Sequence, residues 1–313
     1  MTPSLRSTAV VGAGAVGSFF GAMLARAGHP VTLVARQAHV QAIERDGLRL
    51  QMGGRVEANR TAARTDIDAV RGADLVLFCV KSTDTEAVAR DMAPHLADDA
   101  LVLSLQNGVE NAATIARHVR QPVVAAVVYV ATAMPEPGLV AHHGRGDLVI
   151  GPIDAGAARD PRLAERLQAL VDLFATAHVP VRISADVMAE LWSKLMVNCA
   201  YNAISGIAQA PYGKLAALAA IHELQETIVR EVVALAQAEG VNLPLAPALE
   251  SMRKIAAAMP AQLSSTAQDM ARGKPSEIDH LNGFVARRGA ALGIATPANQ
   301  ALYALVRLIE AGR

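Results

Sequence analysis

Three polar side chains recur at four-residue intervals in an otherwise apolar segment: Lys194, Asn198 and Asn202. Residues four apart lie on one face of an α-helix, so the three side chains form a stripe. A lysine ammonium in line with two carboxamides is suited to orient a carboxylate and to donate a proton to a carbonyl oxygen. On spacing alone, a solvent-facing stripe with Lys194 extended past its neighbours explains the pattern equally well.

A glycine-rich segment near the start of the chain points to a different chemistry. Gly12-Ala13-Gly14-Ala15-Val16-Gly17 follows an apolar run and precedes a helical one, which is the context in which Gly-x-Gly-x-x-Gly binds a dinucleotide. The first glycine permits a tight turn, the second lets the backbone approach a pyrophosphate, and the third lets the helix pack on the strand. The helix N-terminus would receive the phosphate charge. A glycine-rich turn without a ligand is the alternative.

The second apolar run, Val31–Ala35, ends in Arg36. NAD-dependent enzymes normally carry an acidic residue here, which binds the ribose 2′-hydroxyl and would repel a 2′-phosphate. A guanidinium is suited to phosphate, so Arg36 favours NADPH as the cofactor. The alternative is a solvated arginine at a strand end.

Lys81 and Gln106-Asn107-Gly108 follow two later apolar runs. Ligands bind outside the carboxyl ends of parallel strands, so we expect both segments to line the cleft. A strand-end lysine and a simple turn are the alternatives.

The elements that must position these residues follow from the hydrophobic pattern. Near-continuous apolar runs are typical of strands buried on both faces of a parallel sheet, and the first half contains five of them: Thr8–Val11, Val31–Ala35, Leu75–Val80, Leu101–Leu105 and Val123–Val130. Helix-like segments lie between them: Ala15–Ala27, Thr85–Ala93 and Ala112–Val119. This alternation predicts a Rossmann-type, doubly wound α/β domain. Two weaker pairs, Leu48–Gln51 with Arg55–Ala58 and Leu139–His142 with Leu148–Ile150, are expected to be antiparallel additions.

From about Asp186 the pattern is helical only, and prolines and glycines mark the helix boundaries. The predicted helices are Val187–Ile204, Leu215–Glu239, Pro247–Ala258, Ala261–Arg272, Glu277–Leu292 and Ala298–Glu310. We therefore predict an NADP(H)-binding Rossmann-type domain over residues 1–184, ending after a strand at Pro180–Ile183, and an all-α substrate-binding and catalytic domain over residues 185–313.

Composition excludes several classes of protein. The 313 residues hold 29 Lys plus Arg and 29 Asp plus Glu, so no global charge attracts nucleic acid or lipid. The two cysteines, Cys79 and Cys199, suit a reducing cytoplasm rather than a disulfide framework. The apolar run after Arg6 is broken by four glycines, which favours a phosphate loop over a signal peptide. We expect no membrane span and no metal site.

In several segments the chain resembles the ketopantoate reductases (2-dehydropantoate 2-reductases). The resemblance rests on the glycine-rich loop, Arg36, Val80-Lys81, Gln106-Asn107-Gly108, Glu190–Asn202, Ser264–Asp269 and Glu277–Gly283. These segments occur in order from Gly12 to Pro297, which is nearly the whole chain.

The resemblance implies the reduction of 2-dehydropantoate to pantoate by NADPH, a step toward pantothenate and coenzyme A. It implies that Lys194 donates the proton to the reacting carbonyl. It also implies that Asn198, Asn202 and Ser265 bind the substrate. Glu277 would bridge the substrate and the nicotinamide ribose, whereas Lys81 and Asn107 would hold the cofactor. From the residues alone, Ser276 and Glu277 are equally consistent with the cap and first turn of a helix.

Two segments depart from the family pattern. Pro211-Tyr212-Gly213 stands where some members carry Pro-Asn-Gly, and Val127–Val130 replaces a Gly/Thr-rich run. Both changes make the pocket bulkier, so reduction of a different 2-oxo acid is the main alternative function. A non-catalytic NADPH-binding sensor would not need a proton donor, so the presence of Lys194 among the polar residues argues against that function. The apolar helix Leu215–Ala238 either fills the core or faces a second copy in a homodimer.

Overall fold

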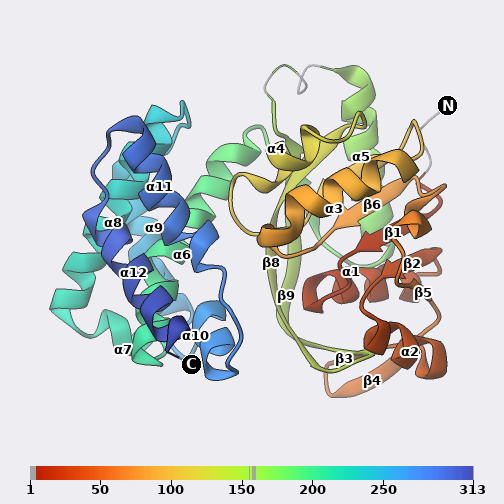
Figure 1. Ribbon diagram of the computed structural model, residues 1–313, viewed down its shortest axis with the longest axis horizontal. Helices are drawn as coiled ribbons and strands as arrows, with labels where there is room; N and C mark the ends of the chain where they lie inside the picture. Colours follow the sequence, from red (N-terminus) through yellow and green to blue (C-terminus); the bar gives the residue numbers. More distant parts are fainter. Residues whose placement is uncertain (1–4, 155, 157–159, 313) are drawn as a thin grey trace. The chain divides into compact units, whose positions relative to one another are not determined.

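The computed structural model describes residues 5–154, 156 and 160–312, which form two compact units (Figure 1). Val187 ends the first unit and Met188 begins the second. The first unit is built on a mixed β-sheet with helices, and the second is helical. The predicted fold class, a Rossmann-type α/β domain followed by an all-α domain, is confirmed.

The described residues of the first unit form a ten-stranded sheet in the order β4-β3-β9-β8-β7-β6-β1-β2-β5, with β10 paired to β9. The strands are β1 (Thr8–Val11), β2 (Val31–Val34), β3 (Leu48–Met52), β4 (Arg55–Asn59), β5 (Ala62–Arg64), β6 (Leu75–Phe78), β7 (Leu101–Ser104), β8 (Val123–Glu136), β9 (Leu139–Pro152) and β10 (Val181–Ile183).

The centre of the sheet is parallel, because its strands are apolar on both faces and are covered on both faces. Val11 at the end of β1 pairs in register with Val34 of β2 and with Phe78 of β6. Phe78 in turn pairs with Ser104 at the end of β7. The segments that follow these strands therefore leave the sheet at one edge.

Five α-helices of the first unit are described: α1 (Ala15–Arg26), α2 (Gln37–Asp46), α3 (Thr85–Met92), α4 (Asn111–Ala116) and α5 (Pro161–Thr176). Helices α1 and α5 share one face of the sheet, where the rings of Phe20 and Phe174 meet edge to face with centroids 6.1 Å apart. Helix α3 packs against α4, as Figure 1 shows.

The predicted pairing of Leu139–His142 with Leu148–Ile150 is wrong. Both segments belong to the single strand β9, which pairs antiparallel with β8 along its length. The glycines between them form no hairpin turn. They flank Arg145, which adopts φ +55°, at a shift in the β8–β9 register. By contrast, β3 and β4 form the predicted antiparallel pair.

The second unit contains α6 (Val187–Ala208), α7 (Tyr212–Ala216), α8 (Ala219–Ala238), α9 (Leu245–Ala258), α10 (Ser265–Ala271), α11 (Asn282–Leu292) and α12 (Pro297–Ala311). The predicted helix Leu215–Glu239 is interrupted at Ala217 and Leu218, which separate α7 from α8. Among the described helices, none combines the length and the apolar character needed to cross a lipid bilayer.

His39 links three parts of the first unit through buried hydrogen bonds. Its Nδ1 accepts from the backbone N–H of Gly138, between β8 and β9, at 2.8 Å. Its Nε2 lies 3.1 Å from the hydroxyl of Ser18 in α1, which donates to the carbonyl oxygen of Ala13. Since Nδ1 is the acceptor, Nε2 carries the proton of the neutral ring. Burial lowers the pKa of His39 below its usual 6.5.

This arrangement predicts a loss of stability at acidic pH. A lowered pKa in the folded state means that the unfolded chain binds the proton more tightly. The His39 contribution is therefore complete above pH 6.5 and is lost as the pH falls through the lower folded-state value. Scanning calorimetry should show that the unfolding temperature of the first unit decreases as the pH falls over that range. The decrease should be smaller in His39→Asn. His143→Asn, at an exposed position, should behave as wild type; an equal change in both variants would contradict the assignment to His39.

Candidate active site

The turn from β1 to α1 requires glycine at two positions. Gly12 has φ +83°, and a Cβ there would lie 2.7 Å from the backbone nitrogen of Val80. A Cβ on Gly17 would lie 2.8 Å from the carbonyl oxygen of Gly12. Both distances are shorter than any ordinary Cβ contact, so these glycines permit the loop to pack against the β6 end and against α1.

Gly14 has a different role, because the space beside it is open. The nearest atom to a Cβ at this position would be the carbonyl oxygen of Gly12, 4.0 Å away. Gly14 is the N-cap of α1, and no side chain caps the helix. The N–H groups of Ala15, Val16 and Gly17 thus begin a twelve-residue helix at an open surface, which is an arrangement that attracts an anion.

Arg36 lies at the same edge as this loop. The backbone N–H groups of Gly12 and Ala13 both donate to the carbonyl oxygen of Val34, at 3.1 Å each, and Arg36 follows Val34 by two residues. Arg36 is exposed and forms the N-cap of α2 without a side-chain hydrogen bond there. A second exposed arginine, Arg64, ends the neighbouring β5, and its carbonyl oxygen accepts from Ala35. Sequence reasoning missed Arg64 because three residues are too few for a recognisable strand pattern.

Lys81 and Asn107 follow β6 and β7 at this edge, and a buried network joins their loops. The amide of Gln106 donates to the carbonyl oxygen of Val80 at 3.0 Å and to the Thr85 hydroxyl at 2.7 Å. The amide of Asn111 donates to the carbonyl oxygen of Asn107 at 2.5 Å. Lys81 is exposed, and Asn107 is partly buried. Gln106 therefore holds the loops together, and the structure brings the predicted residues of the first unit to one edge of the sheet.

In the second unit, Lys194, Asn198 and Asn202 all lie on α6, whose 22 residues carry the predicted stripe. Lys194 and Asn198 are partly buried, whereas Asn202 is only 3% exposed. The stripe is therefore not the fully solvated helix face that spacing alone allowed.

Two buried amides hold α6 from neighbouring helices. Asn282, the first residue of α11, donates to the carbonyl oxygen of Cys199 at 3.2 Å. Gln225 of α8 donates to the next carbonyl oxygen, that of Ala200, also at 3.2 Å. Both amides are 0% exposed. Because hydrogen bonds are directional, these contacts fix the rotation of α6 about its axis and hence the direction of its polar stripe.

Ser264 connects α10 to the end of this stripe. Its hydroxyl donates to the carbonyl oxygen of Asn202 at 3.1 Å and accepts from the N–H of Ala267, which makes it the N-cap of α10. The helix therefore begins at Ser265, later than predicted, and Ser265 itself is exposed. Asn202 and Ser265 lie close together because Ser264 binds one and precedes the other.

Glu277 lies outside a regular helix. A 3-10 turn at Ile278–His280 follows it, and α11 starts only at Asn282. The predicted helix start at Glu277 is therefore wrong. The N–H of Ile278 donates to the hydroxyl of Ser276 at 3.3 Å, and the N–H of Ser276 donates to the Glu310 carboxylate. Glu277 is partly buried, five residues before the asparagine that anchors α11 to α6.

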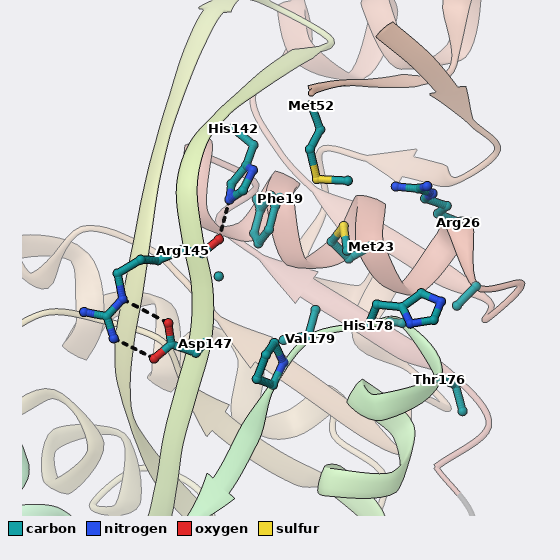
Figure 2. Close-up of a pocket in the computed structure, with 14 residues that line it drawn as sticks. Phe19, Met23, Arg26, Met52, His142, Arg145, Asp147, Thr176, His178 and Val179 are labelled. Carbon is teal, nitrogen blue, oxygen red and sulfur yellow. Dashed lines mark hydrogen bonds and ion pairs between the residues drawn. The ribbon is translucent and has the colours of Figure 1, made fainter. Parts of the chain in front are cut away.

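A pocket of about 450 Å³ in the first unit lies away from the phosphate loop. It is lined from α1 by Phe19, Met23 and Arg26, toward the C-terminal end of the helix, and Figure 2 shows Phe19 beside His142. Arg26 is paired with Glu57, and the Arg145 side chain is paired with Asp147. Because the pocket is lined from the far end of α1 and by no residue of the glycine-rich loop, it is separate from the candidate site. Within the described residues, no cluster of His, Cys, Asp or Glu is arranged to hold a metal ion.

Comparison with known proteins identifies relatives over the whole chain. The profile of ketopantoate reductase PanE/ApbA matches residues 8–155, and the profile of its C-terminal domain matches residues 186–310. A 2-dehydropantoate 2-reductase from Halobacterium salinarum is 36% identical over 304 residues, covering 96% of this chain and 98% of the relative.

Solved structures give the same picture. A PanE/ApbA family ketopantoate reductase from Ralstonia eutropha is 56% identical with a TM-score of 0.88, covering 98% of this chain and 99% of that one. A D-mandelate dehydrogenase, solved with NADH and anilino(oxo)acetate, is 25% identical with a TM-score of 0.89 over the same shares of the two chains.

The anchoring of α6 predicts a measurable cost for losing Asn282. Asn282→Ala removes the donor to the carbonyl oxygen of Cys199. It also removes the donor to the buried Oδ1 of Asn299, which lies 2.9 Å from the Asn282 amide in the wild type. We expect the free energy of unfolding to fall by about 2 kcal/mol. Trp192, the only tryptophan of the chain, is buried in α6, so its fluorescence in urea follows the second unit. Gln300→Ala, at an exposed position on α12, should change the value by less than about 0.5 kcal/mol; equal losses would argue against an anchoring role.

Proposed function

The chain belongs to the ketopantoate reductase family, and we propose that it reduces 2-dehydropantoate to pantoate with NADPH as the hydride donor. It is an oxidoreductase of the 2-dehydropantoate 2-reductase type. The observation that carries the proposal is the polar stripe of α6, in which a lysine and two asparagines lie on one face of a helix whose rotation is fixed by buried amides.

The residues at the edge of the sheet fit a dinucleotide with a 2′-phosphate. The uncapped N-terminus of α1 and the open space beside Gly14 suit a pyrophosphate. Arg36, exposed at the end of β2, offers a guanidinium where an acidic residue would select NAD. Lys81 and Asn107 would complete the cofactor site. Bound NADPH would supply the hydride, and the remaining chemistry belongs to the protein.

That chemistry is the binding of a 2-oxo acid and the delivery of a proton. Lys194 would polarise the carbonyl oxygen and protonate it as negative charge develops. Asn198, Asn202 and Ser265 would bind the carboxylate and hydroxyl groups of the substrate, and Glu277 would bridge the substrate and the nicotinamide ribose. A cofactor sensor would have no use for a proton donor, which favours an enzyme over an NADPH-binding regulator.

The same proposal assigns cofactor binding to residues 1–184 and substrate binding and catalysis to residues 185–313. It places the enzyme in the synthesis of pantothenate and coenzyme A. The unpaired Cys79 and Cys199 favour the cytoplasm. The homodimer expected from the apolar helices stays a prediction.

A second candidate is the reduction of a bulkier 2-oxo acid on the same scaffold. Tyr212 is buried beside Asn202 and donates its hydroxyl proton to that side chain, at a position where some family members carry an asparagine. The likeness to a D-mandelate dehydrogenase solved with an aromatic oxo acid points in the same direction. Catalytic efficiencies with 2-dehydropantoate and with phenylglyoxylate, measured by NADPH oxidation, decide between the two substrates.

Lys194→Ala tests the proton donor. Without the ammonium, the developing alkoxide has neither a neutralising charge nor a proton, so turnover should fall at least ~100-fold. Because the lysine is assigned to the substrate, the dissociation constant of NADPH should stay near wild type in a fluorescence titration. Lys214→Ala, an exposed lysine of α7, serves as the control with normal turnover. Near-native turnover in Lys194→Ala would overturn the assignment.

Arg36→Ala tests the cofactor. Loss of a charge-assisted contact to the 2′-phosphate should raise the NADPH Michaelis constant about 10- to 100-fold and leave that of NADH nearly unchanged. Arg60→Ala is the control, because it removes the same charge at another exposed position, just before β5. It distinguishes a local contact with the 2′-phosphate from a general effect of net charge. If the two cofactors are affected equally in Arg36→Ala, the residue does not read the 2′-phosphate.

A further inference from the structure

Asn202 is held at both its backbone and its side chain. Its carbonyl oxygen accepts from the Ser264 hydroxyl at 3.1 Å. Its side-chain Oδ1 accepts from the Tyr212 hydroxyl at 3.2 Å, in a buried setting. The first contact fixes where the residue lies, and the second fixes which way its carboxamide faces. In the part of the chain that the structure describes, the amide nitrogen Nδ2 makes no hydrogen bond.

Tyr212 is rigidly placed. Its ring packs on that of Tyr201, with centroids 4.6 Å apart and planes tilted by 44°. Its backbone N–H donates to the carbonyl oxygen of Gln262 at 3.0 Å, and the N–H of the next residue, Gly213, donates to that of Pro260 at 2.9 Å. With the backbone anchored and the ring buried, the hydroxyl stays directed at Asn202.

The hydrogen bond between these two residues runs from the Tyr212 hydroxyl to Oδ1 of Asn202. Burial raises the pKa of its phenol far above the usual value, so the hydroxyl is protonated at neutral pH. The O–H then donates to Oδ1, and the two N–H groups of Asn202 face away from Tyr212. With Oδ1 turned toward Tyr212, the N–H groups of Nδ2 are the ones that the carboxamide presents on its other side.

We infer that Tyr212 is a positioning residue that orients the carboxamide of Asn202 so that it donates to the substrate. The inference rests on the proposed function, in which Asn202 contacts the 2-oxo acid. It narrows the chemistry of that contact, since a group bound by Nδ2 must be an acceptor such as a carboxylate or carbonyl oxygen.

Tyr212→Phe tests the inference by removing the hydroxyl and keeping the ring. The freed carboxamide can then turn its oxygen toward the substrate, so the Michaelis constant for the 2-oxo acid should rise roughly tenfold. Turnover should change much less, and the Michaelis constant for NADPH should be unchanged. In an Asn202→Ala background, where no carboxamide remains to be oriented, adding Tyr212→Phe should have no further effect.

Tyr201→Phe is the matched control, because the Tyr201 hydroxyl is also buried but donates to the backbone oxygen of Met252 at 2.9 Å. Both single variants should lower the thermal midpoint, whereas only Tyr212→Phe should alter substrate binding. An active wild type with an unchanged Michaelis constant in Tyr212→Phe, or additive effects in the double variant, would overturn the inference alone. A wild type inactive with every 2-oxo acid would overturn the proposed function and the inference with it.

Discussion

The close approach of Gly12 to the backbone of Val80 determines the geometry of the sheet edge that is proposed to bind the nucleotide. A Cβ at position 12 would lie 2.7 Å from the Val80 nitrogen, so the loop after β1 reaches the end of β6 only because it lacks one. This contact, together with the two N–H groups that the loop donates to Val34, sets the loop against both neighbouring strand ends. The N-terminus of α1, Arg36 and Lys81 therefore lie at one edge of the sheet.

The second unit positions its polar residues by a different means. Helix α6 is largely apolar, and the hydrophobic effect that drives its burial is not directional. Donors from Asn282 and Gln225 to consecutive carbonyl oxygens, and from Ser264 to that of Asn202, specify a single rotation. Burying a polar atom without a hydrogen bond costs free energy, and among the described residues the Gln225 Oε1 and the Asn282 Oδ1 are buried without one, so the anchoring of α6 carries a cost in stability.

The difference between the two mechanisms explains what the sequence could predict. The loop, the central parallel strands and the stripe of α6 follow from short, local patterns, which predict where these elements begin. The end of β8 is different, because it lies at Glu136 and not at the predicted Val130. The segment from His142 to Asp147 was misread as a turn because its glycines are a local turn signal, whereas pairing with the distant β8 makes it part of a strand. The start of α11 and the break before α8 depend on tertiary contacts in the same way, and no periodic pattern records them.

The same limit applies to individual site residues. Residue type and family resemblance point to Ser265 and to Gln106-Asn107-Gly108, but neither reveals that Ser264 and Gln106 are the members bonded into the scaffold. Tyr212 shows the consequence most clearly. From the sequence alone, Tyr212 stands where some family members carry an asparagine, which predicts a lost substrate contact and a bulkier pocket. In the structure its hydroxyl donates to Oδ1 of Asn202, so the tyrosine sets which way that carboxamide faces. Under the proposed function, substrate choice would depend on how these polar residues are hydrogen-bonded to one another, and only the folded arrangement determines that.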